Sequence, residues 1–225
     1  MKKSSHLSII LGLISGFIAS ENALGWQSNE TPSWSILGSL GYTFYEAAYS
    51  GTPQNYAPTS AIGDGETALG RFAIARSFWT YDKLNFGLET GIQSGNQFRL
   101  NISQPIVENF GGLLPQITIK PQLDLLATMH YQPQQFIFMG ILKLGVAWRR
   151  MQIDDRNTLN DLSQAGFEAQ LGAGCNITPS ANLSLNYQFI YNGQANFTYD
   201  SQQQIGHISN IPNQNGILLS LAYTI

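Results

Sequence analysis

Apolar residues at every second position define the last stretch of the chain. Ile217, Leu219, Leu221, Tyr223 and Ile225 alternate with small or polar residues. Successive side chains of a β-strand point to opposite faces of a sheet, so this pattern predicts a strand with one apolar face. Such a strand suits a sheet whose apolar face contacts lipid.

The same alternation recurs along the rest of the chain. Each stretch is about ten residues long, which is the length that a tilted strand needs to cross a bilayer. With the last strand, the pattern predicts an all-β fold, an eight-stranded antiparallel up-and-down transmembrane β-barrel. The other seven segments cover roughly 34–44, 68–79, 84–93, 117–128, 136–149, 167–177 and 182–191.

Pro121 interrupts the alternation within the segment 117–128, which suggests a local bulge. We expect Lys120 and Asp124 to point inward there. The residues expected on the apolar outer face are Ile117, Ile119, Leu123 and Leu125.

The connections between the segments differ in length. Three are short, near 81–83, 132–134 and 178–181, and four are long, roughly 46–67, 94–116, 150–164 and 192–214. This asymmetry is typical of outer-membrane barrels, which have short periplasmic turns and long outer loops. Aromatic residues near both boundaries predict two girdles, with Trp34, Trp79 and Tyr223 at the short-turn end and Tyr42, Phe44, Trp148 and Tyr191 at the other.

The start of the chain has the pattern of a secretory signal. Lys2 and Lys3 precede an apolar run over 7–19, and small residues follow at positions 23 and 25. The run is shorter than the roughly 20 apolar residues of a spanning helix. We therefore expect a cleaved signal peptide over 1–25, a barrel domain over 26–225, and export to the outer membrane of a Gram-negative bacterium.

The composition argues against a soluble protein and against a nucleic-acid-binding protein. Charged residues make up 11% of the chain, against roughly 25% in soluble proteins. Without the signal segment, 9 basic and 13 acidic residues remain of the original 11 and 14, a net charge of about −4 that gives no basic footprint for nucleic acid. We expect no cofactor and no metal. Cys175 is the only cysteine, so no intrachain disulfide can form.

Charged residues recur on the inward positions. Because buried charges must be paired, we predict a lumen filled with ion pairs. Hairpin register predicts Asp124 opposite Lys143, and Arg149 near Glu168. A gated path, in which the pairs exchange partners, is the alternative to a polar core that holds the barrel shut. The inward charges are Arg71, Glu89, Lys120, Asp124, Lys143, Arg149 and Glu168.

These features resemble the OmpA-like outer-membrane β-barrel family. The terminal strand carries the resemblance best, because its alternation and its aromatic Tyr223, third from the end, match the family's assembly signal. Ile225 departs from the aromatic residue expected there. The resemblance implies four outer loops, contact with outer-membrane lipid and lipopolysaccharide, and recognition by the barrel-assembly machinery through the C-terminal strand.

A second resemblance concerns His207-Ile208-Ser209-Asn210 and the following Pro212-Asn213. They look like elements of the outer-membrane lipid A deacylases, which implies Ser209 as nucleophile, His207 as base and Asn210 in an oxyanion hole. The spacer between the two elements is shorter than in that family, and no Asp or Glu follows His207 to serve as the acid. A polar loop explains the same residues.

Three functions follow. A structural or surface-interaction role comes first, because loops rich in Asn, Gln, Ser and Thr suit contacts with an extracellular or host partner. A lipid A hydrolase using His207 and Ser209 comes second. A narrow channel or a carrier of small hydrophobic ligands comes third.

Overall fold

The computed structural model describes residues 33–46, 67–99, 116–133, 138–154, 161–193, 195, 197–200 and 205–225. The predicted signal peptide and much of the predicted loops lie outside these residues. Within the described ranges, no helix has the length and apolar character to cross a membrane.

The described residues form long strands and short accessory ones. The long strands are β1 (Trp34–Glu46), β2 (Thr67–Tyr81), β3 (Leu84–Gln93), β6 (Gln122–Tyr131), β7 (Phe138–Asp154), β8 (Leu162–Thr178), β9 (Ala181–Tyr191) and β12 (Asn213–Thr224). The short strands are β4 (Asn96–Arg99), β5 (Gln116–Ile119), β10 (Phe197–Asp200) and β11 (Ile205–Ile208).

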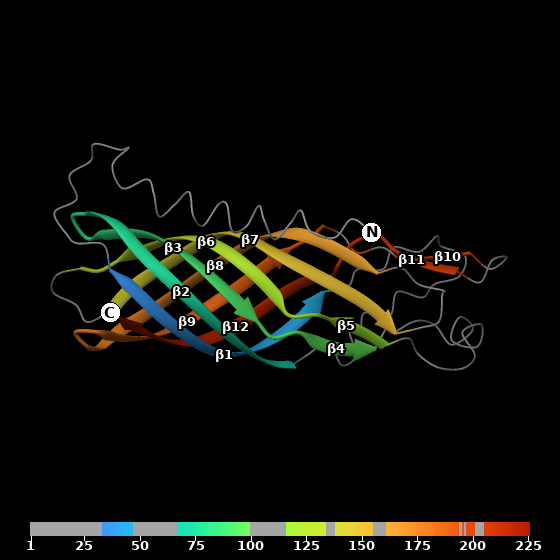
Figure 1. Ribbon diagram of the computed structural model, residues 1–225, viewed down its shortest axis with the longest axis horizontal. Helices are drawn as coiled ribbons and strands as arrows, with labels where there is room; N and C mark the ends of the chain where they lie inside the picture. The colour runs from blue at the N-terminus through green and yellow to red at the C-terminus, as the bar shows by residue number, and fades with distance from the viewer. Residues whose placement is uncertain are drawn as a thin grey trace. The chain divides into compact units, whose positions relative to one another are not determined.

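The long strands close into one antiparallel barrel, as predicted (Figure 1). Their order around the wall is β7-β6-β3-β2-β1-β12-β9-β8, and β8 pairs back onto β7. The first and last long strands, β1 and β12, are neighbours. A closed sheet has no free edge, so the backbone groups of its strands find partners within the wall.

Alternating side chains give the barrel an apolar outside. The outward residues of β12, from Ile217 to Tyr223, are 50–57% exposed, whereas Leu218 and Ser220 between them are buried. The third segment also divides as predicted, with Ile92 exposed and Glu89 and Gln93 buried. The inner face is polar in the middle of the wall.

The predicted bulge at Pro121 is present, but it changes the outward assignment upstream of it. Ile117 and Ile119 are 0% and 2% exposed, while Leu123 is 44% exposed. An extra residue between β5 and β6 exchanges the inner and outer positions, because side chains alternate with a period of two. The prediction that Ile117 and Ile119 face outward is therefore wrong.

The wall extends further at the long-loop end than predicted. Arg150 pairs with Ser163 and Met151 with Leu162, so much of the predicted connection 150–164 belongs to β7 and β8. β5 pairs with the outer part of β7, and β4 pairs with β5. The predicted loop 192–214 contains the hairpin of β10 and β11, which the sequence pattern did not indicate.

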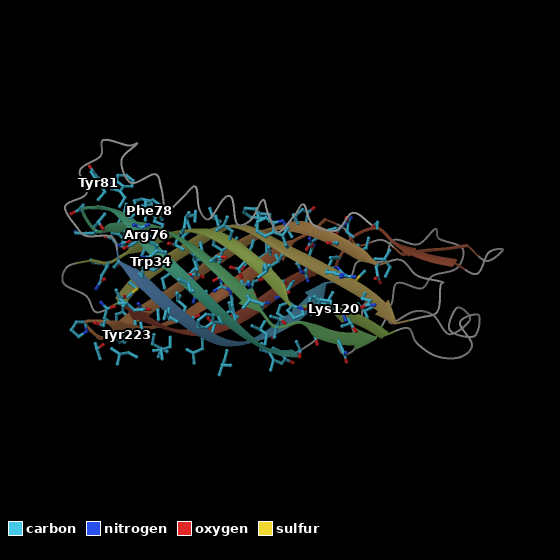
Figure 2. All side chains as sticks on the ribbon, viewed as in Figure 1. Trp34, Arg76, Phe78, Tyr81, Lys120 and Tyr223 are labelled. Carbon is cyan, nitrogen blue, oxygen red and sulfur yellow. The ribbon has the colours of Figure 1, made fainter. Side chains whose placement is uncertain are left out.

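Aromatic residues gather at the short-turn end, as Figure 2 shows for four labelled side chains. Trp34 lies beneath the Arg76 guanidinium, 5.2 Å from ring centroid to Cζ. A second bulge at Phe78 lets Trp79 stack on Phe86, with ring centroids 4.8 Å apart. The labelled aromatic residues at this end are Trp34, Phe78, Tyr81 and Tyr223.

Candidate functional site in the barrel lumen

Four charged side chains form a continuous ladder across the lumen. They come from β2, β3, β6 and β7, which are consecutive in the wall, and each lies at an inward position. Arg71 is central, because its Nη1 lies 2.7 Å from Glu89 Oε1 and its Nε donates to Asp124 Oδ2 at 2.8 Å. Lys143 Nζ lies 2.7 Å from Glu89 Oε2. We call Asp124, Arg71, Glu89 and Lys143 the charged ladder.

The ladder is buried throughout. Its side chains are at most 3% exposed. Removing one partner of such a pair leaves an uncompensated buried charge, at a cost of about 3–5 kcal/mol. The ladder therefore ties neighbouring parts of the wall together through the lumen.

The predicted pairing of Asp124 with Lys143 is wrong. Lys143 lies opposite Thr128, and Asp124 lies opposite Ala147. The prediction centred the β6–β7 turn near Pro133, whereas this register centres it about two residues later. The strands therefore slide by four residues relative to the prediction, and Asp124 meets Arg71 instead.

Glu168 lies among amides. Its Oε1 accepts hydrogen bonds from Gln170 Nε2 and Gln188 Nε2, both at 2.7 Å. Gln188 also donates to Gln93 at 3.0 Å and accepts from Gln214 at 3.3 Å. We call Gln93, Gln170, Gln188 and Gln214 the amide band.

Arg149 closes the lumen nearer the long-loop end. Its Nη1 donates to the Pro212 carbonyl at 2.8 Å and to Asn192 Oδ1, and its Nη2 donates to Gln214 Oε1 at 3.3 Å. Its Cζ lies 5.6 Å from the ring centroid of buried Tyr45. We call Arg149 with these four partners the outer clamp.

Arg149 and Glu168, which were predicted to lie near one another, do not form a direct ion pair. Glu168 lies opposite Gly145 and Arg149 opposite Gln164, so the two are four positions apart along the β7–β8 pair. Among the residues that the structure describes, no salt bridge joins Glu168 to a basic side chain. A chain of hydrogen bonds runs instead from Arg149 through Gln214 and Gln188 to Glu168.

Lys120 does not join the interior charges. It lies between β5 and β6, and its backbone N–H donates to the Arg150 carbonyl at 2.9 Å. The preceding opposed pair, Ile119 and Met151, is buried. The next pair, Lys120 and Arg150, therefore shares the outer face, and the prediction of an inward Lys120 is wrong for the same parity reason as above.

The candidate catalytic segment lies beside the outer clamp. His207 belongs to β11, where it lies opposite Thr198, and its side chain is outside the described part. Gln164 Nε2 donates to the Ser209 carbonyl at 3.3 Å and to Asn210 Oδ1 at 2.9 Å. Gln164 Oε1 accepts from the Ile211 N–H at 2.9 Å.

These bonds fold the segment against the barrel. Ile208 and Ile211 on either side of Ser209 and Asn210 are 2% and 0% exposed. The Asn210 oxygen accepts from Gln164, and the segment packs by its isoleucines. The described contacts thus give this segment a role in covering the lumen, and the catalytic interpretation of His207, Ser209 and Asn210 stays a prediction.

Sequence reasoning missed the residues that depend on a loop. Tyr45 and Gln214 lie on strands and could have been found by extending the alternation of β1 and β12 outward. Gln164 and Asn192 lie next to connections, where no periodicity indicates direction. In the described ranges, no group of three His, Cys, Asp or Glu residues could hold a metal ion.

The site and the wall together define a class. A closed eight-stranded antiparallel barrel, apolar outside and polar inside, is the fold of small outer-membrane β-barrels. No protein-family model and no curated protein matches the sequence.

The chain is similar to several solved structures of bacterial outer-membrane proteins. Escherichia coli outer membrane protein W is 10% identical, with 88% of this chain and 100% of that chain covered and a TM-score of 0.51. Neisserial surface protein A is 9% identical, with 87% and 100% covered and a TM-score of 0.48. A major outer membrane protein of Thermus thermophilus is 15% identical, with 87% and 100% covered and a TM-score of 0.45.

Proposed function

We propose that this protein is an integral outer-membrane β-barrel whose filled lumen holds the wall rigid while its long-loop end makes contacts at the cell surface. The observation that carries the proposal is the division of side chains between an apolar outside and a charged, hydrogen-bonded inside. The barrel anchors the chain, and the connections at the long-loop end carry the interaction role.

The exterior supports membrane insertion. Large apolar side chains on every long strand are exposed, among them Leu40 at 74% and Leu171 at 65%. A monomeric soluble protein rarely exposes a contiguous apolar patch beyond a few hundred Å². Lipid hydrocarbon around the barrel would remove the free-energy cost of exposing these apolar side chains to water.

The interior supports a structural role over a channel. The buried charged residues of the described part are three basic and three acidic, so their charges balance: Arg71, Lys143, Arg149, Glu89, Asp124 and Glu168. An eight-stranded barrel is just wide enough for side chains to fill it. The charged ladder, the amide band and the outer clamp occupy successive parts of that space.

Location and partners complete the proposal. Residues 1–25 act as a cleaved signal peptide for passage across the inner membrane of a Gram-negative bacterium. The barrel-assembly machinery recognises β12, whose outward positions are apolar to the end. Lipid and lipopolysaccharide surround the wall, and the connections at 47–66 and 192–212 meet extracellular or host surfaces.

Two measurements test these roles. Planar-bilayer recording of the wild type and of Asp124→Asn should give no steady conductance, and open-channel conductance in the wild type would contradict the filled lumen. Deleting residues 197–206 should change binding to surface partners while the folded barrel still migrates faster than the boiled one on gels. A deletion without effect on surface binding would remove the interaction role from this hairpin.

A further inference from the structure

Two basic residues lie side by side on the outer face of the wall. The backbone bond from Lys120 to Arg150 places them opposite one another on neighbouring strands. Within the described part of the chain, the Lys120 side chain has no hydrogen-bond or ion-pair partner. Arg150 makes one long ion-pair contact, 3.9 Å to Asp161. The side chains of Arg150 and Asp161 are both about half exposed. A solvent-exposed ion pair such as Arg150 with Asp161 contributes little to the stability of the fold.

This cation pair, Lys120 and Arg150, lies at a defined height. Arg150 follows the outward Trp148 of β7 by two residues, about 7 Å further toward the long-loop end. Aromatic girdles mark the boundary between hydrocarbon and headgroups. The cation pair therefore lies at the level of lipid phosphates in the outer leaflet.

A groove on the outer surface of the wall reaches Pro121, the residue that follows Lys120 in the chain. It has a volume of about 560 Å³ and crosses the outer surface of β1, β2 and β3 as far as Pro121. Gly38 and Gly70 form its floor, since an added Cβ at either would meet no atom within 4 Å. Leu40, Phe72 and Ile92 line it and are 48–74% exposed.

We infer that the cation pair and this groove form one binding site for a phosphorylated, acylated lipid of the outer leaflet, the lipid A part of lipopolysaccharide. The phosphate lies between Lys120 and Arg150, and one acyl chain fills the trough over Gly38 and Gly70. Figure 2 shows Lys120 where the barrel wall gives way to the β4–β5 extension. The site rests on the proposed membrane insertion, because both parts need a surrounding leaflet.

Charge and shape together favour this occupant. Basic residues near an anionic lipid surface attract its headgroups, which corresponds to about fivefold in affinity for each charge. A groove without side chains lets an acyl chain approach the backbone closely, and packing drives association within lipid. A ligand that carries a phosphate next to an acyl chain satisfies both parts at once.

The test uses the full-length mature protein refolded in phosphatidylcholine vesicles that contain lipid A or phosphatidylglycerol. Native mass spectrometry after gentle detergent extraction measures the retained lipid. Lys120→Gln with Arg150→Gln should lower lipid A retention at least tenfold. The matched control, Arg76→Gln with Lys83→Gln, removes two charges at the short-turn end and should leave retention unchanged.

A second pair of variants tests the groove without changing charge. Gly70→Leu fills the trough and should lower lipid A retention several-fold. Gly140→Leu is the control, because Gly140 is also exposed and an added Cβ there would lie 4.0 Å from the nearest atom. Gel migration before and after boiling establishes that each variant is folded.

Each outcome decides the matter. Equal losses in the charge variant and its control, or equal retention of phosphatidylglycerol and lipid A by the wild type, would overturn the site while leaving the barrel proposal intact. If Gly70→Leu and Gly140→Leu change lipid A retention equally, the groove is not part of the binding site. A wild type that does not insert into vesicles would overturn the proposed function, and the site with it.

Discussion

The middle of the lumen and its long-loop end are built in different ways. The charged ladder uses residues of four neighbouring strands, each placed by the alternation of its own strand. The outer clamp joins a strand residue, Arg149, to Asn192 and Pro212 from the connection between β9 and β12. One region is a property of the wall, and the other depends on a loop that folds over it.

The difference implies two levels of stability. Breaking the charged ladder affects the wall itself, because Arg71 and Glu89 each hold two partners. Breaking the outer clamp frees the segment around residues 208–212 from the barrel but leaves the strands of the wall paired. Local opening of this kind occurs at free energies below that of global unfolding.

The largest expected effect is that of Arg71→Ala. The change leaves Glu89 with one partner and Asp124 without its guanidinium, so the barrel should lose about 3–5 kcal/mol of unfolding free energy. Urea titration in lipid vesicles, followed by tryptophan fluorescence, measures this loss. Arg76→Ala removes an outer-face arginine and should cost about 1 kcal/mol or less; equal losses would contradict the ladder's role.

A smaller effect is expected for Arg149→Met, which keeps much of the side-chain volume but removes the bonds of the outer clamp. Bonds to charged groups contribute about 1.5–3 kcal/mol each. Limited proteolysis within residues 192–212 should become faster, while the urea midpoint of the wall moves little. A large drop in the urea midpoint without faster cleavage would show that Arg149 belongs to the wall.

Gln164→Ala should have a milder form of the same effect. Its side chain makes three hydrogen bonds to residues 209–211, each worth about 1 kcal/mol. Cleavage between 205 and 212 should rise several-fold, and Gln170→Ala, in the amide band, should leave cleavage there unchanged. If Gln164→Ala does not change the cleavage rate, Gln164 does not hold residues 209–211 against the barrel.

The smallest expected effect is that of Ser209→Ala. If the segment covers the lumen, mass spectrometry of lipid A from producing cells should show identical acylation with the wild type and the variant. Loss of a lipid A acyl product on substitution would establish the hydrolase. His207→Ala would then be expected to abolish the same product.

The comparison also explains how far the sequence could predict the structure. Strand number, order and the inward position of Arg71, Glu89, Asp124, Lys143 and Glu168 follow from a period of two, which is robust within a strand. Pairing between strands depends on turn geometry, and a difference of two residues in one turn centre moved Lys143 away from Asp124. The extra residue at Lys120–Pro121 exchanged faces for Lys120 and Ile119.

The loop residues of the outer clamp were beyond sequence reasoning for a different reason. Asn192 and Pro212 follow or precede strands, so no alternation fixes their direction. Arg149 was placed inside by the alternation of its strand, but its hydrogen-bond partners lie 43 to 65 residues away along the chain. Only the folded loop brings them together.

The most direct test of the central claim measures whether each face of the wall is exposed to lipid or to water. In a Cys175→Ser background, a nitroxide label is placed at Leu171→Cys, an outward position 65% exposed, or at Gln170→Cys, an inward position 1% exposed. In vesicles, the label at 171 should collide readily with oxygen and rarely with a water-soluble nickel complex, and the label at 170 should be shielded from both. Frequent collision of the label at 171 with the nickel complex would contradict the account.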